Sequence, residues 1–161
     1  MSEFTKGDFL TSQVSPRRAT EVLIVLTIMV IAMGGMIRIY DAGESCPDWP
    51  TCFGTLGFDI SEEEQGEWWE ENPDEADSRG SGHRYTSFQI FTEWFHRLLA
   101  GALVGPLVIV NWFLVRREIW NSQRVQGVSS LTFALILWQG AVGWLTVKFD
   151  NENWSVAIHL G

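Results

Sequence analysis

Cysteine and positive charge are both scarce in this chain of 161 residues. Its two cysteines, Cys46 and Cys52, are too few for a disulfide-dense scaffold or a four-cysteine zinc site. Its 11 basic residues are outnumbered by 20 acidic ones, which gives a net charge of −9. Binding a nucleic-acid backbone requires a basic face. The composition therefore excludes nucleic acid as a partner and allows one disulfide at most.

Long uncharged runs account for much of the 46% hydrophobic content. They cover residues 22–37, 98–115 and 125–147, and a fourth apolar segment opens at Trp154. At about 1.5 Å per residue, the second and third runs can cross a hydrocarbon core of about 30 Å, and the first can do so with its flanking residues. The sequence predicts an all-α integral membrane protein. We expect an up-down four-helix bundle, with three complete helices and the start of a fourth.

Basic residues lie before the first run and between the second and third runs. By the positive-inside rule, these ends of the helices are cytoplasmic. We therefore expect a multi-pass protein of the plasma membrane, with residues 1–18 as a cytoplasmic arm, 19–161 as a membrane half-bundle and loop 41–87 outside. The basic residues are Arg17, Arg18, Arg116, Arg117 and Arg124.

The expected outer loop is strongly acidic. Residues 41–90 contain 13 carboxylates and two basic residues, with the acidic residues concentrated in 62–77. Segments of this composition are usually solvated. We expect a disordered or loosely folded loop rather than a metal site, with His83 at its surface.

The second helix begins with three ionisable residues, Glu93, His96 and Arg97. Ionisable groups at membrane depth are unfavourable unless they are paired or solvated. Glu93 and Arg97 are four residues apart on one helical face, so they can pair, and His96 is within reach of Glu93. The pattern is compatible with an interfacial ion pair beside a histidine, and it is compatible with a functional site.

A second histidine, His159, favours the functional interpretation. If the two helices begin near Phe88 and Trp154, His96 and His159 lie about 12 Å and about 7.5 Å along them. Both helices enter from outside, so the two imidazoles lie at similar depth. Adjacent axes at about 8–10 Å put diagonal helices about 11–14 Å apart, enough for a porphyrin. The pair predicts a haem-iron site.

The outer end of the first helix carries Arg38 and the two cysteines. In an oxidising compartment, Cys46 and Cys52 can form a structural disulfide or cycle between thiol and disulfide. Arg38 can pair with Asp41 or bind a haem propionate. The sequence leaves both questions open.

Several motifs, in this order and in this loop context, resemble those of the haem A synthase family. That family converts haem O to haem A for cytochrome oxidase by oxidising the C8 methyl group to a formyl group. The motifs are Gly34-Gly-x-x-Arg38, Ala42-Gly-x-Ser-Cys-Pro-Asp-Trp-Pro-x-Cys52, Glu93-x-x-His96-Arg97, Gln139-Gly-x-x-Gly143-x-x-Thr-Val147 and His159-Leu.

The resemblance implies a role for each site residue. His96 and His159 would bind the haem iron, with Arg38 and Arg97 as further haem-binding residues. Glu93 would stabilise positive charge at the oxidised carbon, since a carboxylate in a low-dielectric pocket does so better than water. The cysteines would form a disulfide or a redox relay. The implied partners are haem O, a haem O synthase, an electron donor and the lipid bilayer.

The sequence ends before the family's second half, which holds haem b. We expect a fragment, with a half-size enzyme that assembles as a homo-oligomer as the alternative. The acidic insertion at 59–81 makes the first outer loop longer than is usual in the family. Two other functions use the same residues: a b-type membrane cytochrome that carries electrons, and a quinone-linked disulfide oxidoreductase.

Overall fold

The computed structural model describes residues 15–75, 78–149 and 151–160. In these ranges the chain forms helices joined by loops, with no β-strand. Residues 1–14 of the expected N-terminal arm lie outside the described residues. In chain order, the helices are α2 (Pro16–Ile39), α3 (Glu62–Glu71), α4 (Ser87–Arg97), the π-helix η1 (Leu98–Val104), α5 (Gly105–Glu118), α6 (Gln123–Lys148) and α7 (Asn153–Leu160).

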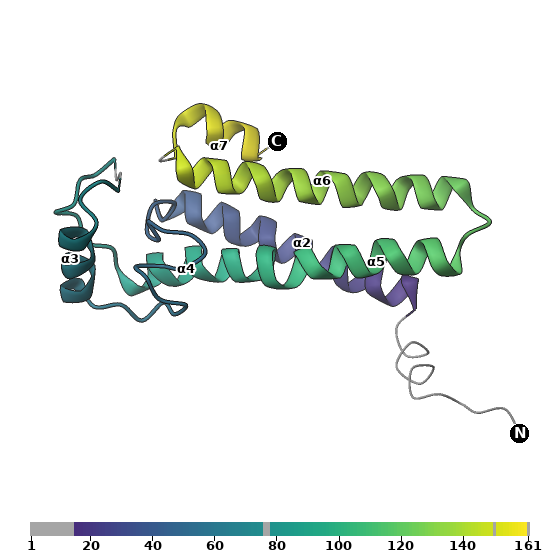
Figure 1. The fold of residues 1–161 in the computed structure, drawn as a ribbon, viewed down its shortest axis with the longest axis horizontal. Coiled ribbons are helices and arrows are strands. Elements are labelled where there is room, and N and C mark those ends of the chain that lie inside the picture. Colours follow the sequence, from purple (N-terminus) through teal and green to yellow (C-terminus); the bar gives the residue numbers. More distant parts are fainter. Residues whose placement is uncertain (1–14, 76–77, 150, 161) are drawn as a thin grey trace, which may run out of the picture.

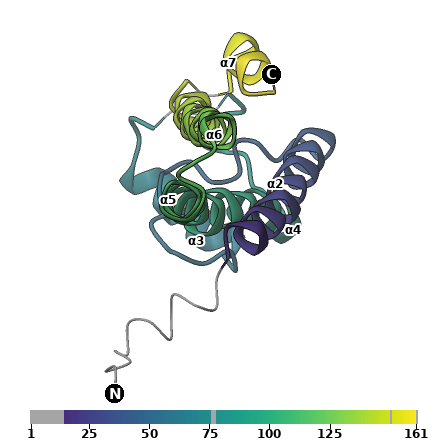
Figure 2. The same cartoon turned by 90° about the vertical axis from the view of Figure 1, so that its right-hand side faces the viewer.

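Among the described residues, three helical segments are long and apolar enough to cross a membrane: α2, the continuous run from α4 through η1 to α5, and α6. Figure 1 shows these segments running in alternating directions, with α7 folded back beside the C-terminal end of α6. Viewed along the bundle in Figure 2, the membrane elements follow the cyclic order α2, α4–α5, α6 and α7. The predicted all-α membrane fold is confirmed.

Helix α2 begins before the uncharged run because its first turn is capped. The side chain of Ser15 accepts a hydrogen bond from the backbone N–H of Arg18 at 3.4 Å. Pro16 occupies the first turn, where a missing N–H leaves no bond unmade. The 24 residues of α2 extend about 36 Å at the usual helical rise. The flanking residues therefore supply the length that the uncharged run lacks.

The second of these segments, Ser87–Glu118, which we call the middle helix, widens directly after Arg97. In η1 the N–H of Gly105 donates to the carbonyl oxygen of Ala100, five residues earlier. Pro106 follows, and a proline inside a helix lacks an N–H and crowds the carbonyl four residues before it. A wider turn relieves this crowding. The π-helix thus separates the outer part of the helix, which carries the ionisable residues, from the inner part.

Small apolar clusters hold the bundle together at its centre. Leu23 of α2 packs against Val104 and Val108 of the middle helix, and all three are buried. Partly buried side chains from α2, α5 and α6 surround them. Most other apolar side chains of α2 and α6 point outward, as expected for helices that face lipid.

The acidic outer loop is folded, so the expectation of a disordered or loosely folded loop is wrong for the residues that the structure describes. Helix α3 begins with a capping box, in which Ser61 and Glu64 bond to each other's backbone N–H groups at 3.2 and 2.7 Å. Hydrogen bonds from the Ser61 side chain and backbone lower the pKa of Glu64 below its ordinary value. Local capping therefore defines the start of this helix.

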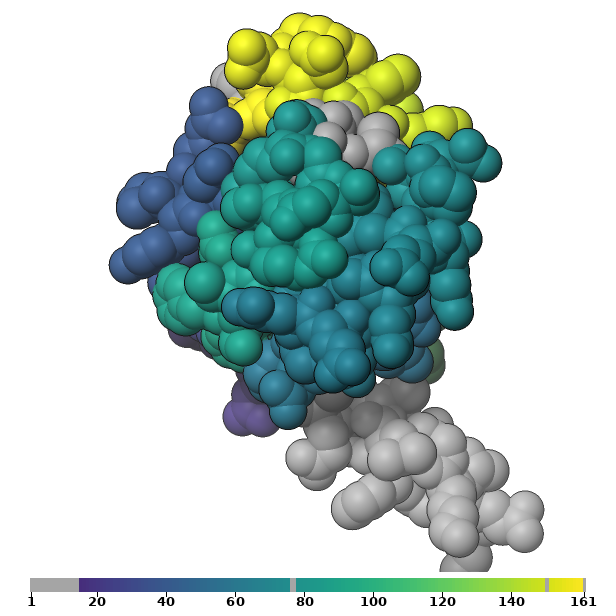
Figure 3. Space-filling view, turned by 90° about the vertical axis from the view of Figure 1, so that its left-hand side faces the viewer, coloured from purple at the N-terminus to yellow at the C-terminus, as the bar shows by residue number. Residues whose placement is uncertain are grey.

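Aromatic residues explain why the loop folds despite its charge. Trp69 is only 4% exposed and packs with Phe53, Tyr85 and the two cysteines in one buried cluster. Each buried aromatic side chain removes about 150–250 Å² from water, and this burial offsets the cost of ordering the loop. The carboxylates of α3 remain largely exposed. Figure 3 shows the segment between α2 and α4 covering the outer end of the bundle.

Candidate functional site

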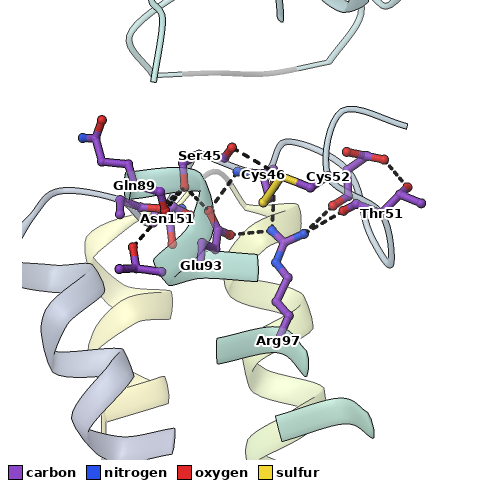
Figure 4. Close-up of polar contacts among 12 residues, drawn as sticks. Ser45, Cys46, Thr51, Cys52, Gln89, Glu93, Arg97 and Asn151 are labelled. Atoms are coloured by element: carbon purple, nitrogen blue, oxygen red, sulfur yellow. Dashed lines mark hydrogen bonds and ion pairs between the residues drawn. A yellow bond between two sulfur atoms is a disulfide. The ribbon is translucent and has the colours of Figure 1, made fainter. Parts of the chain in front are cut away.

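Glu93 is the most enclosed ionisable residue of the predicted site, with 4% of its surface exposed. Its Oε2 accepts hydrogen bonds from the backbone N–H of Cys46 at 2.9 Å and from the hydroxyl of Ser45 at 3.0 Å. Its Oε1 accepts one from Nη2 of Arg97 at 2.5 Å. Figure 4 shows these three donors converging on the carboxylate. The ion pair expected from the spacing of Glu93 and Arg97 is therefore present, and loop donors complete it.

Arg97 holds the outer loop against the middle helix. Its Nη2 also donates to the carbonyl oxygen of Cys46 at 2.6 Å, and its Nη1 donates to those of Asp48 at 2.5 Å and Thr51 at 3.2 Å. One guanidinium thus fastens three points of the segment that contains both cysteines. These contacts turn Arg97 toward the loop and Glu93.

Cys46 and Cys52 form a disulfide, and each is only 1% exposed. The turn between them is closed by further contacts, among them hydrogen bonds to the Asp48 carboxylate from the Thr51 hydroxyl and from the backbone N–H of Gly54. The bridge therefore lies in a compact turn directly above the Glu93 carboxylate. Of the states that the sequence left open, the structure contains the bonded one.

The two predicted ligand histidines lie close together, with their rings edge to face. The ring centres of His96 and His159 are 6.5 Å apart, and their planes meet at 89°. Glycines make room for both rings. A Cβ at Gly34 would lie 3.4 Å from Cε1 of His96, and a Cβ at Gly143 would lie 2.9 Å from Cε1 of His159. Helices α2 and α6 therefore carry glycine where the imidazoles approach them.

The hydrogen bonding of the two rings leaves a nitrogen of each ring available to a ligand. Nδ1 of His96 lies 3.1 Å from the carbonyl oxygen of Val30, and because a carbonyl only accepts, Nδ1 carries the hydrogen. This leaves Nε2 free to bind a metal, the usual arrangement for a ligand histidine. Nδ1 of His159 is buried without a hydrogen-bond partner among the described residues. Within the described part of the chain, each ring therefore keeps a nitrogen without a hydrogen-bond partner.

Arg38 lies exposed in the last turn of α2, and its side chain makes no hydrogen bond or ion pair within the described part of the chain. Asp41, the carboxylate considered as its partner, pairs with Arg79 at 3.3 Å instead. Arg38 follows Gly34 by four residues, so it is on the same helical face as the glycine that adjoins His96. The structure thus leaves this cation available one turn outside the histidine pair.

His83 differs from the expectation of a surface residue. It is half-buried, and its ring packs edge-on against Tyr85 with the ring centres 4.7 Å apart. Its ring is part of the packing of the outer loop.

Sequence reasoning missed two residues at the site. Ser45 is completely buried beside Glu93, and its only signal was its place directly before Cys46. Asn151 donates from Nδ2 to the carbonyl oxygen of Gly43 at 2.6 Å, across 108 residues of sequence. A lone asparagine between two helices gives no signal of so distant a contact.

Comparisons with known proteins agree on one family. Residues 17–161 match the family model COX15-CtaA, described as cytochrome oxidase assembly protein. The haem A synthase of Shewanella oneidensis is 33% identical over 139 residues, which cover 86% of this chain and 38% of that protein. The haem A synthase of Erythrobacter litoralis is 32% identical over 156 residues, which cover 84% of this chain and 43% of that protein.

A eukaryotic relative has a different domain composition. The haem A synthase–mitochondrial ferredoxin fusion protein of Schizosaccharomyces pombe is 25% identical over 143 residues, which cover 83% of this chain and 22% of that protein. The chain therefore spans about two fifths of the bacterial relatives' length and about a fifth of the fusion protein's. No solved structure matches it.

Proposed function

The chain belongs to the COX15-CtaA family of cytochrome oxidase assembly proteins, and from this premise we propose that it is the haem O-binding half of a haem A synthase. The enzyme would convert the C8 methyl group of haem O to the formyl group of haem A by two hydroxylations and loss of water, with an external oxidant taking up the electrons removed from the carbon. Its bacterial relatives named haem A synthase support this activity. A site for haem b would lie outside the described residues.

The observation that carries the proposal is the close pair of imidazoles, with a buried carboxylate one helical turn from one of them. His96 and His159 have their ring centres 6.5 Å apart, and Glu93 lies one helical turn from His96. The two histidines would hold the haem iron, which supplies the oxidation chemistry when haem is bound. A surface ion pair beside a chance histidine would not explain why two glycines clear space for the rings.

Glu93 would act electrostatically on the substrate. Its carboxylate is fixed by Ser45, by the Cys46 amide and by Arg97, so it cannot rotate freely. A fixed negative charge in a site shielded from water stabilises positive charge that develops nearby in the transition state. We assign to Glu93 the stabilisation of the carbon that is oxidised.

The two arginines would have different roles. Arg38 is unpaired among the described residues and lies on the face of α2 that adjoins His96, so it would bind a haem propionate. Arg97 donates to Glu93 and to three loop carbonyls, so it would orient Glu93 rather than contact haem. This assignment departs from the haem-binding role expected for Arg97.

The proposed enzyme works in the plasma membrane with the disulfide loop outside, receives haem O from a haem O synthase and needs an electron donor. The fusion of one relative to a ferredoxin supports an iron–sulfur protein as that donor. The three membrane-spanning helices fit a substrate as apolar as haem O.

The test is conversion of haem O. The protein, expressed from its natural gene in a host that makes haem O but no haem A, should yield haem A in the extracted haems. His96→Ala should reduce that yield at least about 10- to 100-fold, the usual effect of losing metal-site support. His83→Ala, a histidine outside the membrane helices, is the matched control and should leave the yield unchanged.

Two outcomes would reject the proposal. Stable haem binding without any haem A would indicate a b-type cytochrome. A yield that survives His96→Ala and disappears in Cys52→Ala would indicate disulfide chemistry instead.

A further inference from the structure

We propose that Asn151 is a positioning residue of the haem site, which joins the segment carrying His159 to the loop that holds Glu93. This inference rests on the proposed function above and adds a residue to it. Asn151 lies in the turn between α6 and α7, far in sequence from both Glu93 and the disulfide. Figure 4 draws it together with the polar contacts of Ser45, Gln89 and Glu93.

The contact between Asn151 and the loop is short and closely packed. Nδ2 of Asn151 donates to the carbonyl oxygen of Gly43 at 2.6 Å. A Cβ at Gly43 would lie 3.4 Å from Oδ1 of Asn151 and 3.5 Å from its Cγ and Nδ2. The absence of a side chain at Gly43 therefore lets the amide lie directly against the loop backbone.

The backbone of Asn151 turns the chain from α6 into α7. Its φ is +49°, in the left-handed region that asparagine tolerates better than most residues. Its N–H donates to the carbonyl oxygen of Thr146 at 3.0 Å, which closes the end of α6. After this turn α7 packs back on α6, and His159 comes to lie against Gly143. The conformation of Asn151 thus helps to direct the helix that carries the second ligand.

On the other side of the contact, Gly43 leads into the donors that hold Glu93. Ser45 and Cys46 follow it by two and three residues, and both bond to the same carboxylate oxygen. Gln89 fixes the preceding backbone, since its side chain donates to the carbonyl oxygen of Tyr40 at 3.1 Å. The loop is therefore fastened by α4 at one point and by the α6–α7 turn at another.

The Asn151 side chain consequently connects the loop that holds Glu93 with the helix that carries His159. If the Asn151 amide is lost, the Glu93 loop and the His159 helix can move relative to each other. The distance between the carboxylate and the haem is then less well defined. Supporting interactions of this kind typically change metal affinity or activity about 10- to 100-fold when they are removed.

Two substitutions separate the amide from the backbone conformation. Asn151→Gly keeps easy access to the left-handed region and removes the hydrogen bond. Asn151→Asp keeps the shape and puts an acceptor opposite the Gly43 carbonyl. Asn121→Gly is the matched control, because Asn121 lies exposed in the inner turn and makes no hydrogen bond within the described residues.

We expect both Asn151 variants, made in the protein expressed from its natural gene, to insert into membranes at the level of the unaltered protein. Their haem A formed per bound haem should fall about 10- to 100-fold, and the low-spin spectrum of the bound haem should shift. A loss of stability alone would lower the amount of protein and leave that spectrum unchanged in what remains. Asn121→Gly should match the unaltered protein in all three measurements.

Gly43→Ala tests the same contact from the loop side if a variant at Asn151 fails to insert. Its added Cβ would press on the Asn151 amide, and the same spectral shift is expected. If the Asn151 variants insert and keep the haem A formation and the spectrum of the unaltered protein, the inference is overturned. If they do not insert, the same result in Gly43→Ala overturns it. If the unaltered protein itself forms no haem A, the proposed function fails instead.

Discussion

Glu93 has one carboxylate oxygen bonded to the outer loop and the other to its own helix. Two donors reach Oε2 from Ser45 and Cys46, and Arg97 reaches Oε1. A buried carboxylate with this many donors has one well-defined orientation. Its charge can therefore act at one place in the site, which is what stabilisation of a transition state requires.

Replacing Glu93 with glutamine keeps the size of the side chain and removes the charge. We expect haem to bind to Glu93→Gln, because neither histidine is altered, while haem A formed per bound haem falls about 100- to 1000-fold. The measurement is haem extraction and quantification from purified protein. Glu70→Gln on exposed α3 is the control. Full activity in Glu93→Gln would assign the oxidation step to other groups.

Two glycines on α6 differ in what surrounds them. A Cβ at Gly143 would lie 2.9 Å from His159, whereas one at Gly140 would have no atom within 4 Å. We expect Gly143→Ala to displace the imidazole and weaken haem binding about 10- to 100-fold, and Gly140→Ala to bind haem normally. Haem titration followed by absorbance compares the two. Equal binding by both would mean that His159 is not an iron ligand.

At the scale of the element, the middle helix combines three functions in sequence. Its capped start anchors the outer loop through Gln89, its next turns carry Glu93, His96 and Arg97, and η1 then changes the helical turn before α5. The widened turn sets the rotation of the outer part relative to the inner part. The placement of His96 toward α2 and α7 thus depends on the whole helix.

Helix α3 should respond to acid at its first turn. The pKa of Glu64 is lowered from 4.5 in the folded protein by hydrogen bonds from Ser61. Its contribution to stability is therefore complete above that ordinary value and is lost as the pH falls through the lower, folded value. Tryptophan fluorescence from Trp68 and Trp69 should report a loosened loop in acid. Glu64→Gln should make the signal less dependent on pH, and an unchanged pH response would contradict this account.

At the scale of the whole molecule, the site lies at the boundary between the membrane and the folded outer loop. Figure 1 places α3 and the loop at the end where α4 begins and α6 ends. The loop closes over the carboxylate with its aromatic cluster and disulfide, and the helices supply the imidazoles. Under the proposed function, such a boundary would give haem O access from lipid while polar groups still reach its reacting end.

The orientation of the molecule can be tested by labelling. With the basic inner link in the cytoplasm, a cysteine introduced at Ser81 should react with a membrane-impermeant maleimide on intact cells. One introduced at Asn121 should react only after the membrane is opened. Both positions are exposed in the structure, so a difference in labelling reports only the side of the membrane on which each position lies. The reverse pattern would place the disulfide loop in the cytoplasm.

The sequence alone was sufficient for features that depend on near neighbours. The membrane helices follow from apolar runs long enough to span the bilayer, and the Glu93–Arg97 pair follows from a spacing of four residues on one helix. The histidines stood out because ionisable groups in such runs need a reason to be there. The two rings were expected at similar depth, and in the structure their centres lie 6.5 Å apart.

Only the tertiary structure decided how distant segments meet. The Cys46 amide on Glu93, the Asn151 amide on Gly43 and the aromatic cluster that folds the acidic loop all join residues far apart in sequence. The composition of that loop predicted a solvated segment, because its high charge can be counted in the sequence. The burial of its aromatic rings cannot be counted in this way, because it depends on residues that the fold brings together. Periodicity and spacing describe one element at a time, whereas these contacts depend on how the elements pack.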